Sequence, residues 1–337
     1  MKAMVLRKCC PVDQQPLVLT DIPVPQPADN ELLLKVSVCG ACHTDLDQAE
    51  GRVAPSKLPV VPGLQVVGTV TDIGKSVIKF RVGDRLGVTW LNSTCDNCRF
   101  CKSARENLCE RAKWTGKDVD GGYAEYMVIG QDYAYPLPAR LSDSQAAPLL
   151  CAGVIGYRTL RLAQIADGET IGLFGFGASA HIIIQLIMHK FPHSTVYAFT
   201  KTEEHAELAK QLGAAWTGRS GDKPPVKLNK IMDFTPVGEC VRDALGVLEK
   251  GGRLVINAIR KETPIPPIDY GELLWLEREI KSVANVTRRD AEEFLSLAGE
   301  IGIVPTVEEF PLKQANEVLW RIKNSKLRAA AVLRIGV

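Results

Sequence analysis

Four cysteines in one short stretch have the spacing of a metal site. They form the pattern C-x2-C-x2-C-x7-C with Cys95, Cys98, Cys101 and Cys109. Thiolates at these intervals can close a tetrahedron around one zinc ion, and a closed set of four sulfur ligands leaves no position open for a substrate. An iron–sulfur cluster is the main alternative, but the spacings typical of those clusters differ from this one. We therefore expect one structural zinc ion.

A second chemical motif is a glycine turn of the form G-x-G-x-x-A. It lies between an apolar run, Thr170–Phe174, and an apolar segment of helix length, Ile182–His189. In a dinucleotide site the first glycine makes a tight turn, the second admits the pyrophosphate, and the small third residue lets the helix pack on the strand. The free amides of the helix N-terminus face the phosphates. We expect cofactor contacts from Gly175, Phe176, Gly177 and Ala178; the alternative is a tight turn in an α/β domain that binds no ligand.

The end of the next predicted strand, Thr195–Thr200, bears on which dinucleotide binds. NAD sites usually carry an acid about 20 residues after the glycines, on the ribose 2′-hydroxyl. Here the strand continues into Thr200, Lys201 and Thr202, and the first carboxylate is Glu203. The threonine hydroxyls and the lysine charge suit a 2′-phosphate. The sequence thus favours NADP(H), and NAD stays possible if Lys201 is only a solvated loop lysine.

Composition excludes several classes of protein. The chain has 337 residues and a net charge of +2, so nothing favours binding to nucleic acid or to an anionic membrane surface. No apolar run is long enough to cross a membrane, and the first residues do not form a secretory signal. Ten cysteines in such a chain suggest metal ligands or free thiols rather than disulfides. We expect a cytoplasmic protein with two domains.

The elements that must position these motifs change character along the chain. The first part has short strands separated by turns, predicted at Met1–Leu6, Leu17–Thr20, Leu32–Val38, Gly63–Gly74 and Arg81–Val88. Helices and strands alternate afterwards, with helices at Ser142–Leu150, Gly156–Ile165 and Glu203–Leu212 and strands at Ile231–Thr235 and Arg253–Asn257. Ligands of parallel sheets lie beyond the carboxyl ends of the strands. Thr235, Asn257 and Ala258 are therefore further candidates for cofactor binding, with plain loop structure as the alternative.

Taken in order, these motifs resemble a known family. Besides the cysteine loop and the glycine turn, they are G-x-C-H-T-D around Cys42, Pro62-Gly63, Gly121–Tyr126 and Cys151–Val154. Over essentially its whole length the chain resembles a zinc-type alcohol dehydrogenase of the medium-chain dehydrogenase/reductase family. The resemblance implies an α/β fold in which a Rossmann parallel-sheet domain, 149–287, is inserted into a GroES-like β-rich catalytic domain, 1–148 plus 288–337. It also implies a homodimer or homotetramer, because Glu279–Val286 resembles the edge strand that pairs subunits in the family. Two further predicted helices, Ala291–Ile301 and Lys313–Asn324, belong to the returning β-rich domain.

The resemblance also assigns catalytic roles. In the family a catalytic zinc is held by two cysteines and a histidine. Cys42 and Cys151 match the cysteines. Thr44 is expected to pass a proton at the substrate oxygen, and His43 to contact the cofactor pyrophosphate. Asp47 stands where many members have the histidine that ends the proton relay. Trp90 matches an aromatic wall of the substrate pocket.

One position departs from the family in a way that changes the chemistry. The zinc-binding histidine belongs to a Pro-Gly-His-Glu motif, which reads Pro62-Gly63-Leu64-Gln65 here. Leucine cannot bind a metal, so we expect the catalytic zinc to be absent or fractional. Two alternatives are a metal held by Cys42, Cys151, Asp45 and water, and a substitution introduced into an otherwise zinc-dependent enzyme.

The sequence therefore predicts an NAD(P)-dependent oxidoreductase, with NADP(H) favoured, acting on a small-molecule alcohol or ketone. Without the catalytic zinc, bulky apolar ketones or alcohols are the expected substrates. The alternatives are a conventional zinc-dependent alcohol dehydrogenase and a dinucleotide-binding protein without catalytic activity.

Overall fold

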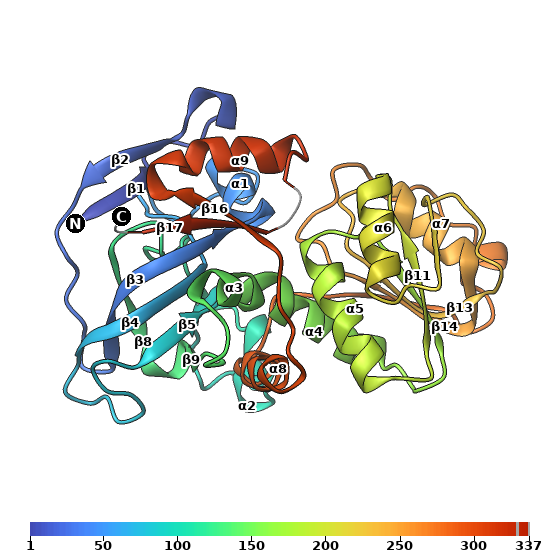
Figure 1. Cartoon of the computed structure of the whole chain (residues 1–337), viewed down its shortest axis with the longest axis horizontal. Helices are drawn as coiled ribbons and strands as arrows, with labels where there is room; N and C mark the ends of the chain where they lie inside the picture. The colour runs from blue at the N-terminus through green and yellow to red at the C-terminus, as the bar shows by residue number, and fades with distance from the viewer. Residues whose placement is uncertain (328–329, 336–337) are drawn as a thin grey trace. The chain divides into compact units, whose positions relative to one another are not determined.

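The computed structural model describes residues 1–327 and 330–335, and the chain divides into two compact units. Unit 1 is Met1–Val154 with Asn285–Val337, and unit 2 is Ile155–Ala284 (Figure 1). The boundaries expected from the sequence, 148 and 288, lie a few residues away. The first difference arises because Leu149–Gly153, a turn of π-helix, packs on helix and strand elements of unit 1.

Unit 1 is built on a seven-stranded sheet. Its strands run in the order β16-β17-β3-β4-β5-β9, with β8 also pairing with β3, and every pairing except β16–β17 is antiparallel. Strands β1 and β2 form a separate hairpin pair, and β6 pairs with β7. The strands are β1 (Lys2–Leu6), β2 (Leu17–Asp21), β3 (Glu31–Ala41), β4 (Gln65–Ile73), β5 (Arg85–Val88), β6 (Leu91–Ser93), β7 (Lys113–Trp114), β8 (Tyr126–Gly130), β9 (Ala134–Pro136), β16 (Val307–Pro311) and β17 (Ala330–Arg334).

Apolar side chains on this sheet and on the helices beside it form the core of unit 1. The longest strand, β3, carries wholly buried Leu32 and Leu34, and Val332 and Leu333 of β17 are buried beside it. The helices are α1 (His43–Ala49), α2 (Arg99–Lys102), α3 (Asp143–Pro148), α8 (Arg288–Ile301) and α9 (Ala315–Lys323). Helices α3 and α8 each begin with a capping box, in which a hydroxyl and a side chain three residues later satisfy amides that the helix leaves free.

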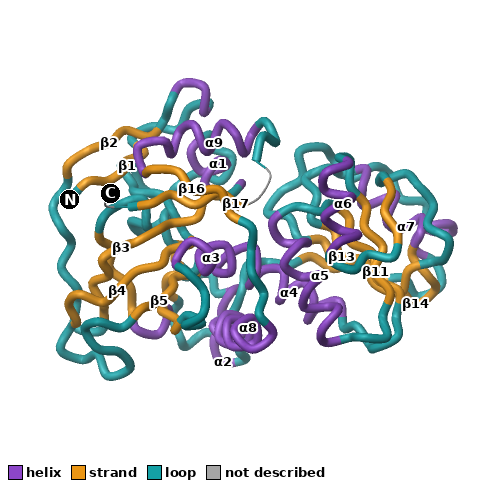
Figure 2. Tube along the Cα trace, in the orientation of Figure 1, coloured by secondary structure: helices purple, strands orange, loops and turns teal. Residues whose placement is uncertain are grey.

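Unit 2 contains a six-stranded parallel sheet in the order β12-β11-β10-β13-β14-β15. Figure 2 shows its strands flanked by helices. The strands are β10 (Thr170–Phe174), β11 (Thr195–Phe199), β12 (Trp216–Gly218), β13 (Leu228–Asp233), β14 (Leu248–Ile256) and β15 (Glu279–Ser282), and the helices are α4 (Val154–Ala163), α5 (Ala178–Lys190), α6 (Glu203–Gln211) and α7 (Glu239–Val247). The strand order reverses between β10 and β13, and such a reversal is where ligands of open parallel sheets bind. This is the expected Rossmann architecture.

Most predicted elements are present, with shifted ends. Strand β14 begins at Leu248 rather than at Arg253, because Leu248 already pairs with Leu228 before an irregularity in the register. The predicted edge strand Glu279–Val286 ends at Ser282, since the chain then turns toward the Thr287 cap of α8. Among the described helices, none is both long enough and apolar enough to cross a membrane.

Candidate functional site

Helix α1 carries the predicted catalytic residues of unit 1. Cys42 caps this helix, since its sulfur accepts the amide of Asp45 and its own amide donates to Asp45 Oδ2 at 2.9 Å. His43 is exposed and Thr44 is half-buried, so both side chains reach solvent. This capping arrangement fixes the orientation of the cysteine and the aspartate at the start of the helix.

The two cysteines expected from the family lie together. The Cys42 thiol hydrogen-bonds to Cys151, and this contact, together with burial, raises the pKa of the Cys42 thiol well above its usual range. Cys151 lies in the π-helical turn Leu149–Gly153, more than 100 residues along the chain. The tertiary structure thus joins the two sulfur positions that the sequence left apart.

Beside them is a buried carboxyl group with an unused acceptor. Asp45 is wholly buried, and within the described residues its Oδ1 has no hydrogen-bond partner. Burial is the main cause that raises the pKa of Asp45 well above its usual range, and the neighbouring Cys42 is the second. The hydroxyl of Tyr123 is buried close to this carboxyl group, and after burial Asp45 is the next cause that raises the pKa of Tyr123. Buried polar atoms of this kind are rare in native structures and call for an explanation.

Leu64 lies in the core of unit 1 with no exposed surface. The next residue, Gln65, is 4% exposed and begins strand β4, and its side chain fills the space beside Gly40. The preceding Gly63 has a φ of +97°, and a Cβ there would stand 2.4 Å from the Tyr123 ring. Only glycine fits this turn, and the turn in turn fixes the backbone position of Leu64.

Asp47 is held in an ion pair. It is 4% exposed, and Arg52 Nε donates to its Oδ1 at 2.6 Å. Arg52 also pairs with Glu50, whose carboxylate accepts the Val12 amide at 2.9 Å and Lys323 Nζ at 3.0 Å. This network anchors the end of α1. The sequence predicted Asp47 but gave no sign of Arg52, because the pairing depends on how the chain turns after the helix.

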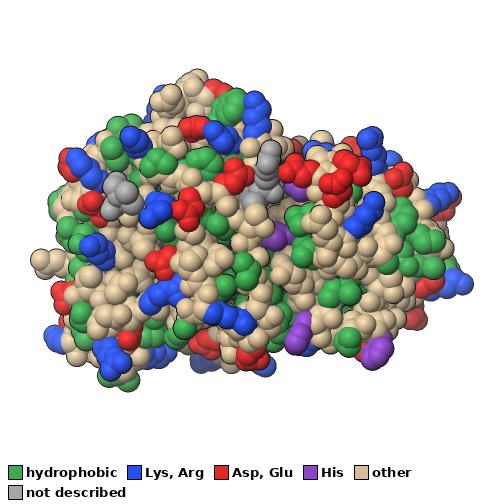
Figure 3. Space-filling model, in the orientation of Figure 1, with side chains coloured by type: hydrophobic (Ala, Val, Ile, Leu, Met, Phe, Trp, Pro, Cys, Tyr) green, Lys and Arg blue, Asp and Glu red, His purple; other side chains and the backbone are tan. Residues whose placement is uncertain are grey.

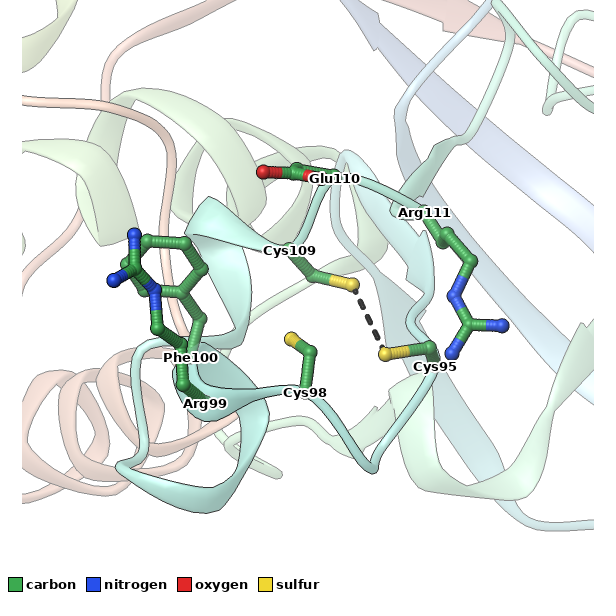
Figure 4. A pocket seen from close by; sticks show the side chains of 7 residues that line it. All are labelled: Cys95, Cys98, Arg99, Phe100, Cys109, Glu110 and Arg111. Atoms are coloured by element: carbon green, nitrogen blue, oxygen red, sulfur yellow. Dashed lines mark hydrogen bonds between the residues drawn. The ribbon is translucent and has the colours of Figure 1, made fainter.

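The four cysteines of the predicted metal site converge. Their sulfur atoms all lie within 4.8 Å of one another. Neighbouring sulfurs are 3.5 Å apart for Cys98–Cys101 and Cys95–Cys109 and 3.9 Å apart for Cys95–Cys101. A zinc–sulfur bond of about 2.3 Å in a tetrahedron requires sulfurs about 3.8 Å apart. Figure 4 shows the sulfurs of Cys95, Cys98 and Cys109 directed into one small space. The geometry fits a tetrahedral ion.

The surroundings of this cluster favour the thiolate form at Cys95 and Cys98, whose pKa values are lowered, whereas burial raises the pKa of Cys101 to about 11. The amide of Asn97 contributes most to lowering the pKa of Cys95, to about 6. Arg111 donates to the Cys95 sulfur, which raises the pKa of the guanidinium. A positive neighbour offsets part of the charge that four thiolates bring to a divalent ion, so the charge and the geometry of these residues suit a metal ion such as zinc.

The glycine turn follows β10 as predicted. Gly175 has a φ of +81°, and a Cβ there would stand 2.9 Å from Thr235 Cγ2. At Gly177 a Cβ would meet nothing within 4 Å, so the protein leaves open space beside this residue. No side chain caps the N-terminus of α5, and its first amides remain available to a ligand. Phe176 is 2% exposed, so only its backbone can contact a cofactor.

The predicted 2′-phosphate residues lie at the end of β11. Thr202 Oγ1 accepts the amide of His205 at 3.4 Å and caps α6, so this hydroxyl is already engaged. Lys201 is exposed, and within the described chain its ammonium has no ion-pair partner. The amide of Thr200 donates to the carbonyl of Gly218 at 2.8 Å, and exposed Arg219 follows directly at the end of the neighbouring strand β12. Sequence reasoning missed Arg219, because only the pairing of β11 with β12 makes it a neighbour.

The remaining predicted residues follow β13 and β14. Thr235 comes two residues after the end of β13, and its hydroxyl donates to Asp233 at 2.7 Å. Asn257 and Ala258 directly follow β14 and are half-buried, and the amide of Asn257 donates to the carbonyl of Asp233. All three lie at the carboxyl edge of the sheet, as the strand assignment predicted.

Comparison with known proteins identifies the family. Residues 28–139 match the family model described as "Alcohol dehydrogenase GroES-like domain". The chain is 41% identical over 340 residues to "Probable alcohol dehydrogenase AdhA" of Mycobacterium tuberculosis, covering 99% of this chain and 97% of that protein. The chain belongs to the alcohol dehydrogenases of the medium-chain dehydrogenase/reductase family. An alcohol dehydrogenase of Geobacillus stearothermophilus is 34% identical, covering 99% of this chain and all of that protein.

Solved structures agree with this assignment. A cinnamyl alcohol dehydrogenase from Sorghum bicolor superposes with a TM-score of 0.87 at 26% identity, covering 99% of this chain and 97% of that chain. The predicted fold, a Rossmann domain combined with a GroES-like domain, is therefore confirmed. The predicted enzyme class, an NAD(P)-dependent oxidoreductase, is confirmed as well.

Proposed function

We propose that this family member is an NADP(H)-favouring alcohol/carbonyl oxidoreductase that works without a catalytic zinc ion. The observation that carries the proposal is the buried Oδ1 atom of Asp45, which has no hydrogen-bond partner within the described residues. In the family pattern its carboxylate would orient a metal-binding histidine. Here position 64 is a buried leucine, and Oδ1 of Asp45 has no partner among the described residues. A histidine at position 64 would offer a donor to this atom and a leucine does not, which supports the proposal.

The other groups nearby do not replace the missing ligand. A catalytic zinc needs three protein ligands. In the part of the chain that the structure describes, Cys95, Cys98, Cys101 and Cys109 are the one set of three or more potential ligands that comes together. Cys42 interacts with both Asp45 and Cys151, but these three residues are not such a set within the described structure. The residues of this site therefore do not fit a zinc ion.

Catalysis then depends on the chain's own groups. The dinucleotide supplies the hydride chemistry. The Thr44 hydroxyl is the donor that we assign to the substrate oxygen, and His43 is assigned to the cofactor pyrophosphate. Asp47 is a weak candidate for a proton relay, because Arg52 already occupies its carboxylate at 2.6 Å. A Lewis acid contributes several kcal/mol to such a reaction, and each ~1.4 kcal/mol changes the rate about tenfold. Turnover of simple alcohols should therefore be slow.

A bulky apolar substrate can recover part of this loss through positioning. Leu64 places an apolar side chain at the position where the family has a metal-binding histidine. The structurally similar Sorghum bicolor enzyme is named for cinnamyl alcohol, which is an aromatic alcohol. We therefore propose aromatic and cyclic ketones, or the matching alcohols, as substrates.

The cofactor preference rests on charge at the end of β11. Lys201 and Arg219 are exposed cations on neighbouring strand ends, and no carboxylate precedes Glu203 in this loop. A 2′-phosphate is attracted to such a pair, whereas the 2′-hydroxyl of NAD gains little from it. We propose that NADP(H) binds more tightly than NAD(H).

We also propose that the protein forms a homodimer, or a homotetramer of such dimers, through β15. All four residues of this edge strand are exposed, and Trp275 nearby is 55% exposed. An edge strand presents unpaired backbone groups that can pair with a second copy.

On the face shown in Figure 3, basic and acidic side chains are interspersed, which gives no basic surface there for nucleic acid.

The decisive experiment is zinc analysis of purified, unchelated protein, together with a ketone panel. One zinc per chain, lost in a Cys98→Ser variant, assigns the metal to the four-cysteine cluster and supports the proposal. Two zinc ions per chain would return the protein to the conventional zinc-dependent alcohol dehydrogenases. Tight cofactor binding without hydride transfer to any carbonyl in the panel would instead favour a non-catalytic dinucleotide-binding protein.

A further inference from the structure

A buried ion pair lies at the carboxyl edge of the sheet in unit 2. Asp233, the last residue of β13, has no exposed surface. Lys261 Nζ donates to Asp233 Oδ2 and to the carbonyl of Thr235, both at 2.6 Å, and the lysine side chain is 12% exposed. A buried carboxylate that loses such a partner is strongly unfavourable. The pair therefore fixes the chain after β14 against the end of β13.

The same carboxylate holds Thr235. Its amide and hydroxyl both donate to Asp233 Oδ1, at 2.8 and 2.7 Å. This places the Thr235 methyl against Gly175, where an added Cβ would stand 2.9 Å away. Contacts thus run without a break from the lysine through the aspartate and threonine to the first glycine of the turn. We call Lys261, Asp233 and Thr235 the β13 latch.

The position of the latch in the sheet places it next to one particular half of the dinucleotide. Strand β13 pairs with β10, Asp233 opposite Phe174, at the point where the strand order reverses. The ribose of the adenosine half is read at the strand after the glycine turn, here β11, so the second mononucleotide half lies toward β13 and β14. The latch therefore lines the part of the site that would hold this second half.

We propose that Lys261 and Asp233 are positioning residues for the nicotinamide half of the dinucleotide. Their role is to hold Thr235 against Gly175, so that the nicotinamide ribose packs on a residue whose position is fixed. The inference rests on the proposed dinucleotide site at the glycine turn. It predicts that disturbing the latch weakens binding of the whole dinucleotide and leaves binding of the adenosine half unchanged.

The test compares NADPH with 5′-AMP, which occupies the adenosine half only, by titration calorimetry. In Lys261→Met the dissociation constant for NADPH should rise about tenfold, because Thr235 is no longer held against Gly175 and the nicotinamide half is bound less well. The constant for AMP should stay within about twofold. Lys261→Arg should retain NADPH binding. The matched control is Lys250→Met, which changes an exposed lysine of β14 and should alter neither constant.

A second variant guards against loss of folding. The double substitution Asp233→Asn with Lys261→Met removes both charges and leaves no unpaired ion, so it should unfold near the wild-type temperature and still bind NADPH weakly. Equal weakening of NADPH and AMP, or no weakening of NADPH, would overturn the latch. If the wild-type protein binds none of AMP, NADPH and NADH, the proposed dinucleotide site is wrong, and the latch proposal fails with it.

Discussion

Replacing Leu64 with histidine should restore a metal site. Position 64 directly follows Gly63, whose amide neighbours the Asp45 carboxyl, and the Cys42 and Cys151 thiols already lie together. An imidazole here provides the third ligand, and its second nitrogen can donate to the vacant Oδ1 of Asp45. We expect Leu64→His to bind one more zinc per chain than the wild type.

The structure sets the size of the effect. Leu64 has no exposed surface, so exchanging it for a polar ring loses about 1.5–3 kcal/mol of apolar burial. Satisfying the buried Asp45 oxygen returns about 1–3 kcal/mol. Without metal the free energy of unfolding should therefore change little. Zinc at a hundred times its dissociation constant should then add about 2.7 kcal/mol. For a chain of 337 residues that corresponds to a rise of about 4 °C in the unfolding temperature.

The assay combines zinc content, thermal unfolding with and without added zinc, and oxidation of simple alcohols. Leu64→Gln is the control, since it introduces a polar side chain of similar size without an imidazole. The reasoning fails if Leu64→His holds no more zinc than the wild type and shows no zinc-dependent stabilisation. It also fails if Leu64→Gln responds to zinc in the same way.

Three further predictions concern other parts of the chain. Burial alone would raise the pKa of Glu50, but the Val12 amide and the Arg52 and Lys323 cations outweigh it and lower the pKa to about 2 from 4.5. The carboxylate therefore stabilises the fold above about pH 4.5 and loses this effect as the pH falls toward 2, so Glu50→Gln should cost about 1–2 kcal/mol at pH 7. Urea unfolding from pH 7 to 3 should show the difference from wild type shrinking; a constant difference would contradict the assignment. Lys201→Ala should raise the dissociation constant for NADPH about tenfold and leave that for NADH within about twofold, measured by cofactor fluorescence. Lys223→Ala is the control, and an equal change for both cofactors would count against a 2′-phosphate contact. Ile280→Lys on β15 should convert the oligomer to monomers in light scattering; an unchanged mass would place the subunit interface elsewhere.

Periodicity and turn chemistry were sufficient to predict most of the fold. Strand β10 was predicted at its observed bounds because apolar residues run up to a glycine turn that must end the strand. The ends of β14 and β15 were predicted less well. They depend on register irregularity and on the Thr287 cap, which are set by neighbours distant in the sequence.

The site was predictable where its residues are close together in sequence. The four cysteines lie within one short loop, so their spacing alone indicated a tetrahedral cluster, and the sulfurs converge. Arg52, Arg219 and Lys261 were not predicted. Each matters through a partner that the fold supplies, and a solvated lysine or arginine looks the same in sequence as one that is paired and buried.

The sequence by itself determined which chemistry is available: cysteine thiols at ligand spacing, a glycine turn for a dinucleotide, and a leucine where a metal ligand is expected. These conclusions follow from local residue types. Only the tertiary structure decided which groups meet. It brought Cys151 to Cys42, buried Asp45 without a partner for Oδ1 among the described residues, and paired Asp233 with Lys261. Such contacts arise because strands and helices far apart in the chain pack around a shared core, and the free energy of a buried polar group depends on that packing.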